Sequence, residues 1–261
     1  MKILSLNIRG FGIGSGENKL SWAKELLFKE KPIFVAFQET KLNLVNRQWV
    51  QRLWGNNNCD FLQKEKIGKS GGQLLIWDTS YFAATNAIVF DRVIGIRGIW
   101  KSSGDELNVL NVYGPHDDSR KKLLWETLSK TINDDLWVLC GDFNEVRYPE
   151  ERLNCDFIVN RASMFNNFIE ANKLIDIPLG GRCFTRVSDD GVKFSKLDRY
   201  LVSEIFLNSW GDISVVALER KHSDHCPIIL KSEEKNFGPK PFKFFDAWLD
   251  NKEVDQVVLE A

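Results

Sequence analysis

The sequence lacks the marks of several protein classes. It contains five cysteines, an odd number, and no two of them form a C-x-x-C pair. Disulfide frameworks and zinc sites need paired or clustered cysteines, so we expect neither. No apolar run approaches the roughly 20 residues of a membrane helix. The apolar start of the chain, Ile3–Ile8, is too short and too broken for a secretory segment. We therefore expect an intracellular protein without a membrane partner.

An excess of positive charge is also missing. Lysine and arginine together number 35, aspartate and glutamate 36, and the formal net charge is −1. Stable DNA-binding proteins usually present a basic face, so the overall charge gives no support to a DNA-binding function. An enzyme that binds its substrate transiently needs less positive charge, and a local basic patch is compatible with this composition. Hydrophobic residues make up 43% of the 261 residues, which suits one large domain with a sizeable core.

Strand-like and helix-like segments alternate along the chain. Apolar residues at helical spacing predict helices over residues 20–29, 45–53, 119–132 and 162–172. Apolar runs predict strands over residues 1–8, 33–37, 72–77, 88–90, 93–100, 107–112, 136–140, 194–201, 213–218 and 227–230. Hairpins and helical crossovers are mixed in this order, which favours an α/β fold with mixed sheets and helices outside.

The composition changes after Lys231. Residues 232–240 are polar and include the turn signal Gly238-Pro239. We expect one folded domain over residues 1–231, followed by an extension over residues 232–261. The extension is either a linker into a further region or a C-terminal helix that packs on the domain.

Eight polar residues follow apolar strands in six short motifs. They are Asn7 in LNIRG, Glu39 in FQET, Tyr113 in NVYGP, Asp142 and Asn144 in GDFN, Asp198 in KLDRYLVS, and Asp224 and His225 in SDHCPI. Each alone is weak evidence, because an Asp or Asn after an apolar strand is more often a turn former and His225 alone could be a structural histidine. His222 and His225 are three residues apart, but a zinc site would need further ligands. Six placements in this order are hard to obtain by chance and predict one active site.

The residue types suit the hydrolysis of a phosphodiester. Glu39 and Asp224 are hard oxygen donors of the kind that bind Mg²⁺, with Mn²⁺ as an alternative. Asp142 is placed as the general base that deprotonates a water molecule. Asp198 would fix the tautomer of His225, and a cationic His225 would stabilise charge on the phosphate. The remaining three residues would donate hydrogen bonds, Asn7 to the base and Asn144 and Tyr113 to the phosphate.

These motifs resemble the endonuclease/exonuclease/phosphatase family. The segments SGGQLLIWD, LIDIPLGGRCFTR and KLDRYLVS are similar to the apurinic-type endonuclease domain of plant LINE-type (non-LTR) retrotransposon polyproteins. The resemblance covers residues 1–230 and implies a four-layer α/β sandwich of two packed, mixed, mostly antiparallel sheets flanked by helices. It further implies a nicking activity on duplex DNA, a reverse-transcriptase region in the same polyprotein, and a nuclear location.

Seven residues near the motifs are candidates for DNA contacts: Lys41, Lys69, Arg147, Arg152, Arg182, Thr185 and Arg186. One departure from the family pattern concerns the metal. Some apurinic-type relatives carry an acidic residue two positions after the equivalent of Asn7, and this chain has Arg9. Arg9 argues against a second metal ion and against efficient repair of abasic sites.

Two other functions fit the same motifs. The family includes phosphatases that act on small molecules, although the FTR and KLDRYLVS blocks favour the nuclease branch. The chain could instead be a decayed retroelement product without activity. All catalytic positions are filled, which argues against decay.

Overall fold

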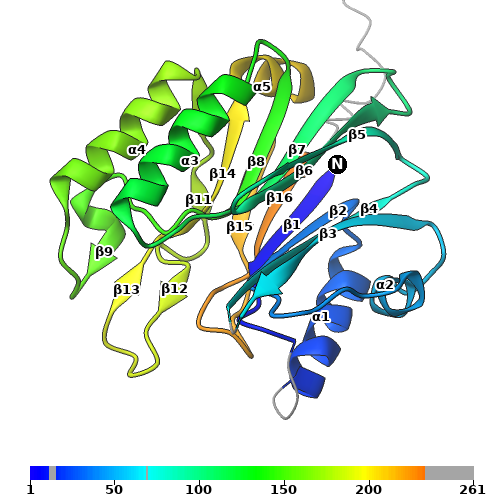
Figure 1. Cartoon of the computed structure of the whole chain (residues 1–261), viewed down its shortest axis with the longest axis horizontal. Coiled ribbons are helices and arrows are strands. Elements are labelled where there is room, and N and C mark those ends of the chain that lie inside the picture. The colour runs from blue at the N-terminus through cyan, green and yellow to red at the C-terminus, as the bar shows by residue number, and fades with distance from the viewer. Residues whose placement is uncertain (12–15, 69, 233–261) are drawn as a thin grey trace, which may run out of the picture.

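A computed structural model describes residues 1–11, 16–68 and 70–232 (Figure 1). The expected extension over residues 232–261 lies outside the described residues except for Ser232, as does the DNA-contact candidate Lys69. Five α-helices are described: α1 (Gly16–Glu30), α2 (Arg47–Trp54), α3 (Asp118–Thr131), α4 (Val159–Ala171) and α5 (Glu204–Trp210). A single 3₁₀ turn, η1, covers Pro149–Glu151. No helix in these residues is long and apolar enough to cross a membrane.

Most strands form two mixed sheets. The seven-stranded sheet has the order β11 (Leu179–Gly180), β15 (Ile213–Ala217), β16 (Ile228–Ser232), β1 (Lys2–Asn7), β2 (Phe34–Gln38), β4 (Ser70–Asp78), β3 (Cys59–Ile67). The six-stranded sheet has the order β10 (Leu174–Asp176), β14 (Asp198–Ser203), β8 (Leu136–Asp142), β7 (Glu106–Tyr113), β6 (Val93–Trp100), β5 (Phe82–Phe90). A small third sheet joins β12 (Arg186–Val187), β13 (Phe194–Ser195) and β9 (Arg152–Leu153).

The two large sheets pack face to face, with helices on their outer sides (Figure 1). Residues of β1 and β2 alternate between two cores, as the two-residue period of a strand requires. Phe34 and Ala36 face the core between the sheets, whereas Val35 and Phe37 pack under α1 and α2. Helices α3 and α4 cover the six-stranded sheet through a separate apolar cluster. The predicted four-layer α/β sandwich is therefore confirmed, and most neighbouring strands are antiparallel.

Local polar groups set several helix ends. The side chain of Asn46 accepts a hydrogen bond from the Trp49 amide at the start of α2, and the helix ends at Gly55 with φ of 97°. Asp117 and Ser203 cap α3 and α5 in the same way. These caps satisfy amides that the first turn of a helix leaves unpaired.

Candidate active site

Strand register brings the predicted residues to one edge of the sandwich. Across β7, β8 and β14, Tyr113 lies opposite Asp142, and Asp142 lies opposite Asp198, so the three form a row. In the other large sheet, Asn7 at the end of β1 lies opposite Gln38 at the end of β2, and Glu39 follows directly. The hydrogen bond from Asn7 Nδ2 to Asp142 Oδ2, 2.9 Å long, joins the two rows across the sandwich.

Glycine is required where these strands approach most closely. Gly141 has φ of 142°, and a Cβ there would lie 1.9 Å from the carbonyl oxygen of Val112 on β7. The residue that precedes Asp142 can therefore have no side chain. Gly72 has φ of 84° and accepts a hydrogen bond from the Thr40 amide, which fixes the loop after Glu39. Glu39 itself has φ of 51°, a conformation that non-glycine residues rarely adopt outside functional sites.

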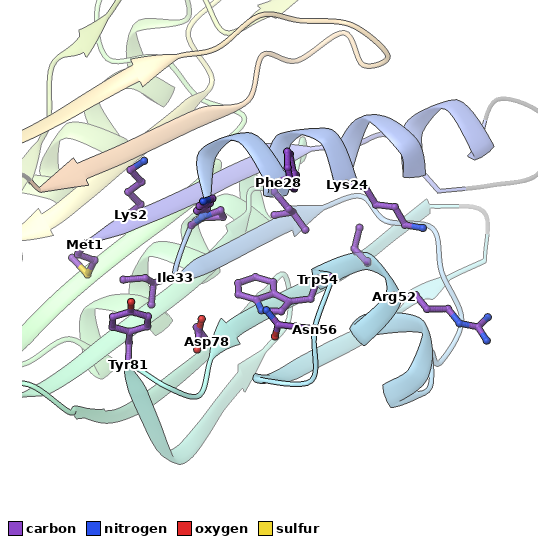
Figure 2. A pocket seen from close by; sticks show the side chains of 15 residues that line it. Met1, Lys2, Lys24, Phe28, Ile33, Arg52, Trp54, Asn56, Asp78 and Tyr81 are labelled. Atoms are coloured by element: carbon purple, nitrogen blue, oxygen red, sulfur yellow. The ribbon is translucent and has the colours of Figure 1, made fainter.

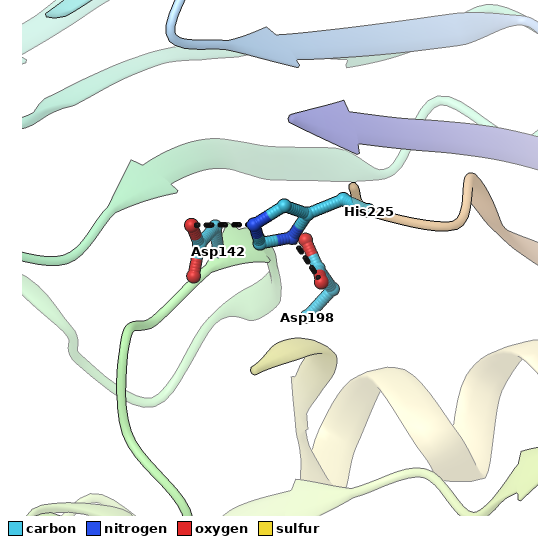
Figure 3. A group of neighbouring side chains, drawn as sticks. All are labelled: Asp142, Asp198 and His225. Atoms are coloured by element: carbon cyan, nitrogen blue, oxygen red, sulfur yellow. Dashed lines mark hydrogen bonds and ion pairs between the residues drawn. The ribbon is translucent and has the colours of Figure 1, made fainter. Parts of the chain in front are cut away.

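A buried acid–base cluster lies at the centre of the site (Figure 3). Nδ1 of His225 is 2.7 Å from Oδ2 of Asp198, and Nε2 of His225 is 3.7 Å from Oδ2 of Asp142. All three side chains are almost completely buried. Asp198 therefore fixes the ring of His225, whose other nitrogen faces Asp142.

The cluster shifts the protonation of its members. Burial favours the neutral form of His225, but the charges of Asp198 and Asp142 outweigh this and raise its pKa to about 9. Burial raises the pKa of Asp142 to about 6, although the His225 charge and the Asn7 hydrogen bond act in the opposite direction. At neutral pH the imidazole is cationic and Asp142 is largely ionised. Asp142, Asp198 and His225 could also offer atoms to a metal, since their ligand atoms lie within 4.8 Å of one another. The contact of Asp198 with Nδ1 leaves Nε2 of His225 facing the Asp142 carboxylate, so we interpret the cluster as acid–base machinery.

Hydrogen bonds orient the Asp142 carboxylate. Its Oδ1 accepts a bond of 2.9 Å from the backbone amide of Asn144, and its Oδ2 accepts the bond from Asn7. Asn144 has φ of 49°, and its side chain donates to the carbonyl oxygen of Gly114 at 2.7 Å. In this structure the side-chain amide of Asn144 therefore fixes the loop through Gly114. The expected contact of this side chain with a phosphate stays a prediction.

The two carboxylates expected to bind a metal lie beside the cluster. Oδ1 of Asp224 is buried and has no hydrogen-bond partner among the described residues. Oε1 of Glu39 is 2.9 Å from the ammonium of Lys41, and the charge of Glu39 acts on the Tyr113 hydroxyl. Burial, Lys41 and Arg9 lower the pKa of the nearby Lys19, and the charges of Glu39 and Asp224 both oppose this shift, so the two carboxylates act on the same small volume. Two carboxylates with an unpartnered oxygen fit a hard divalent cation such as Mg²⁺.

Burial, together with Glu39 and Asp142, raises the pKa of the Tyr113 hydroxyl well above its usual range. This hydroxyl therefore stays protonated at neutral pH. It remains able to donate a hydrogen bond to an anion at the site.

A basic cavity of about 490 Å³ opens next to Asp224. Its cationic lining residues are Arg9, Lys19, Lys41, Arg220 and Lys221. Nη1 of Arg9 lies 3.0 Å from Asp224 and 3.2 Å from Asp189, and Nζ of Lys19 donates to the carbonyl oxygens of Ile8 and Arg9. The cavity concentrates positive charge beside the carboxylates although the whole chain is nearly neutral.

A comparison with protein-family models finds no match, and neither does a search of curated proteins. Solved structures do match. An AP endonuclease from Leishmania major has a TM-score of 0.69 and 16% identity, with 88% of this chain and 86% of that chain covered. A 3′ phosphatase from Neisseria bound to a product DNA hairpin has a TM-score of 0.68 and 19% identity, with 90% and 100% covered. The chain has the endonuclease/exonuclease/phosphatase fold.

A mobile-element protein shares this endonuclease/exonuclease/phosphatase fold. The endonuclease domain of TRAS1, a telomere-specific non-LTR retrotransposon, has a TM-score of 0.63 and 11% identity, with 90% of this chain and 99% of that chain covered. At these identities the likeness establishes the architecture. The chemistry has to be argued from the residues of this chain.

Three of the expected DNA-contact residues stay near the surface of the site. Lys41 contacts Glu39, Nε of Arg186 lies 3.2 Å from Asp224, and Arg182 is exposed. Arg152 is half-buried and donates to the carbonyl oxygen of Asp156. Lys41 and Arg186, which are distant from each other in the sequence, both contribute positive charge near Asp224.

Thr185 and Arg147 form contacts within the fold. Thr185 is completely buried, and its hydroxyl accepts hydrogen bonds of 3.0 Å from the amides of Leu197 and Asp198. The side chain of Arg147 is 15% exposed and contacts Asp176. Both side chains contact residues of neighbouring segments of the fold, and the expectation that these two residues contact DNA stays a prediction.

Two further polar contacts behind the site were not predicted. The buried ammonium of Lys121 on α3 contacts Glu145 and donates to the carbonyl oxygen of Asn144 at 2.7 Å. Gln38 donates to Oδ1 of Asn111 at 2.8 Å, which links the two large sheets. A lysine on an amphipathic helix and an amide within a strand carry no sequence signal for such roles.

Proposed function

We propose that this protein is a divalent-metal-dependent phosphodiesterase that nicks duplex DNA. The observation that carries the proposal is the position of the His225–Asp198 pair, which faces an Asp142 carboxylate oriented by Asn7. A base, a cation and two candidate metal ligands at one sheet edge are the groups that phosphodiester hydrolysis needs.

The residues divide the chemistry among them. Asp142 takes the proton of a water molecule as that water attacks the phosphorus atom. The bond from phosphorus to the 3′-oxygen breaks, and the leaving 3′-oxygen takes a proton from solvent. The cationic His225 donates a hydrogen bond to a phosphoryl oxygen, and Tyr113 offers its hydroxyl to another. Glu39 and Asp224 would hold the divalent cation, which neutralises the phosphate and the leaving alkoxide when it is bound.

The surrounding charge supports a polyanionic substrate. Arg9, Lys41, Arg186 and Arg220 lie around Asp224, where they can contact phosphates on either side of the scissile bond. Few phosphates would be contacted, so we expect DNA binding to weaken only gradually with salt. We expect no requirement for an abasic site.

The biological setting is also part of the proposal. The motif blocks shared with plant LINE-type elements support an enzyme that nicks target DNA and leaves a 3′-hydroxyl to prime reverse transcription. In that setting the protein acts in the nucleus, and a reverse-transcriptase region is its natural partner in the full polyprotein. The likeness to the TRAS1 domain supports this setting at the level of fold.

The test is the relaxation of supercoiled plasmid by the full chain with Mg²⁺, with Mn²⁺ and with EDTA. We expect nicked circles with either metal and none with EDTA. Glu39→Ala and Asp224→Ala should abolish nicking, whereas Glu65→Ala, an exposed change on β3, should not. Near-normal nicking by either carboxylate variant at saturating metal would remove that residue from the metal site.

Oligonucleotide substrates refine the test. Matched duplexes with and without an abasic analogue should be cut at similar rates, and a polymerase should extend the product. A strong preference for the abasic duplex would indicate a repair enzyme. Release of phosphate from small phosphomonoesters, without nicking, would indicate a small-molecule phosphatase instead.

A further inference from the structure

A second cavity of about 710 Å³ lies at the opposite end of the seven-stranded sheet (Figure 2). Met1 and Lys2 line it at the start of β1, whereas Asn7 at the end of the same strand belongs to the active site. Six residue steps along a strand correspond to about 20 Å. This groove is therefore separate from the active site, and what occupies it does not depend on the proposed function.

The groove combines exposed aromatic side chains with unpaired cations. Phe28 on α1 is 83% exposed and Tyr81 is 50% exposed, with Trp54 between them (Figure 2). Large aromatic side chains gathered around a cavity are typical of an interaction site. This surface is suited to an aromatic occupant.

The cations that line the groove favour an occupant with negative charge. Lys24, Lys31 and Arg52 line the groove, and none of them forms an ion pair within residues 1–11, 16–68 and 70–232. Asp78 is the groove's one acidic lining residue. An occupant with carboxylates next to aromatic rings would therefore match both features of the surface.

We propose that this groove binds the chain's own segment Phe242–Asp250, FKFFDAWLD. The path of the backbone supports it. Strand β16 ends at Ser232, where the Ser232 amide donates to the Met1 carbonyl at 2.9 Å and the Met1 amine donates to the Ser232 carbonyl at 3.1 Å. Met1 itself lines the groove. The nine residues 233–241 can span up to about 30 Å, so the segment reaches the groove.

The composition of the segment matches the groove. Phe242, Phe244, Phe245 and Trp248 supply four aromatic rings within seven residues, and Asp246 and Asp250 lie among and after them. From Asp246 to Ala261 there are five acidic residues and one lysine, a net charge of −4. The aromatic rings fill the groove beside Phe28 and Trp54, and Asp246 and Asp250 pair with two of its three unpaired cations.

The experiment is site-specific photo-crosslinking in the full-length chain. A benzoylphenylalanine replaces Phe28, which its exposure allows, and a control protein carries it in place of Leu123, which is 61% exposed on α3. A mixture of ¹⁴N and ¹⁵N protein separates links within a chain from links between chains. We expect links from position 28 to residues 242–250 of the same chain, and none there from position 123. Absence of those links would overturn the proposal, and so would links between two chains, since they would indicate a second copy in the groove.

Charge reversal tests the electrostatic part. Lys24→Glu combined with Arg52→Glu should lower the yield of the intrachain link at least fivefold, because repulsion replaces attraction. Lys122→Glu combined with Lys130→Glu on α3 makes the same change in charge away from the groove and should leave the yield unchanged. An unchanged yield in the first variant would overturn the proposed pairing. Plasmid nicking should be normal in both variants, which separates this test from that of the active site.

Discussion

Nη1 of Arg9 lies 3.0 Å from Oδ2 of Asp224, so a fixed cation contacts a carboxylate that we expect to bind a metal. The guanidinium is 37% exposed and also contacts Asp189, which gives it an alternative partner when a divalent ion arrives. Two positive unit charges about 4 Å apart repel one another by about 4 kcal/mol at an effective dielectric constant of roughly 20, and exposure to solvent reduces the repulsion. We therefore expect Arg9 to compete with a divalent metal ion for Asp224.

Arg9→Met should raise the affinity for Mg²⁺ about tenfold, which corresponds to about 1.4 kcal/mol after screening. Isothermal titration of the metal-free protein with Mg²⁺ measures this directly. Arg47→Met is the matched control, because Arg47 is an exposed arginine that pairs with Asp60 and not with a proposed metal ligand. An unchanged or weaker affinity in Arg9→Met would show that the guanidinium does not compete with the metal.

The double mutant of Asp198 and His225 tests whether the two act as a unit. His225→Ala should slow nicking by about 10²-fold or more, the range expected for an acid–base group. Asp198→Ala should cost about 10- to 100-fold, because Asp198 acts by orienting the ring. The double variant should be little slower than His225→Ala alone. Losses that multiply would show that Asp198 acts independently of His225.

Much of the site was predictable because strand ends converge. A polar residue at either end of a buried strand lies at a sheet edge. Asn7, Tyr113 and Asp142 end such strands, Glu39 directly follows one, and Asp198 begins one. The strands themselves were visible as apolar runs. The order of the strands in the sheets could not be predicted, because a single sequence carries no local signal for which distant strands pair or in which register.

The basic cavity was not predictable for a similar reason. Lys19 and Arg220 line it together although they are 201 positions apart, and each looks like an ordinary surface charge in the sequence.

The range 194–201, predicted as one strand, is divided at Lys196–Leu197 into β13 and β14, which belong to different sheets. Strand β3 and helix α5 were not predicted, because β3 is largely half-exposed and α5 has only seven residues.

Thr185→Val should destabilise the protein strongly for the loss of a single hydroxyl. That hydroxyl accepts hydrogen bonds from the amides of Leu197 and Asp198, and valine would leave both donors buried without a partner. Unsatisfied buried donors cost about 1–3 kcal/mol each, so we expect a free energy of unfolding lower by roughly 2–4 kcal/mol. Urea denaturation measures it. Thr185→Ser keeps the oxygen and should lose much less, and equal losses in the two variants would assign the effect to packing.

The pH dependence of nicking should follow Asp142. Burial raises the pKa of this carboxyl to about 6, so its basic form is lost as the pH falls through about 6. An ordinary aspartate would stay ionised there. We expect kcat/KM to be constant between this range and the His225 pKa of about 9, where the imidazole loses its charge, and to fall about tenfold per pH unit below it. Asp142→Asn should be nearly inactive at every pH, because an amide cannot accept the proton of the attacking water.

Asn7 provides the decisive variant, because its hydrogen bond to Asp142 favours the ionised form and lowers the carboxyl pKa. Asn7→Ala removes that bond, so the acid limb of the profile should move to higher pH in addition to any loss of rate. Asn58→Ala, an exposed change before β3, should leave the limb in place. An acid limb that stays fixed in Asn7→Ala, or that moves to lower pH, would assign the titration to a group other than Asp142. The direction of this shift therefore identifies the base independently of how much activity the variant retains.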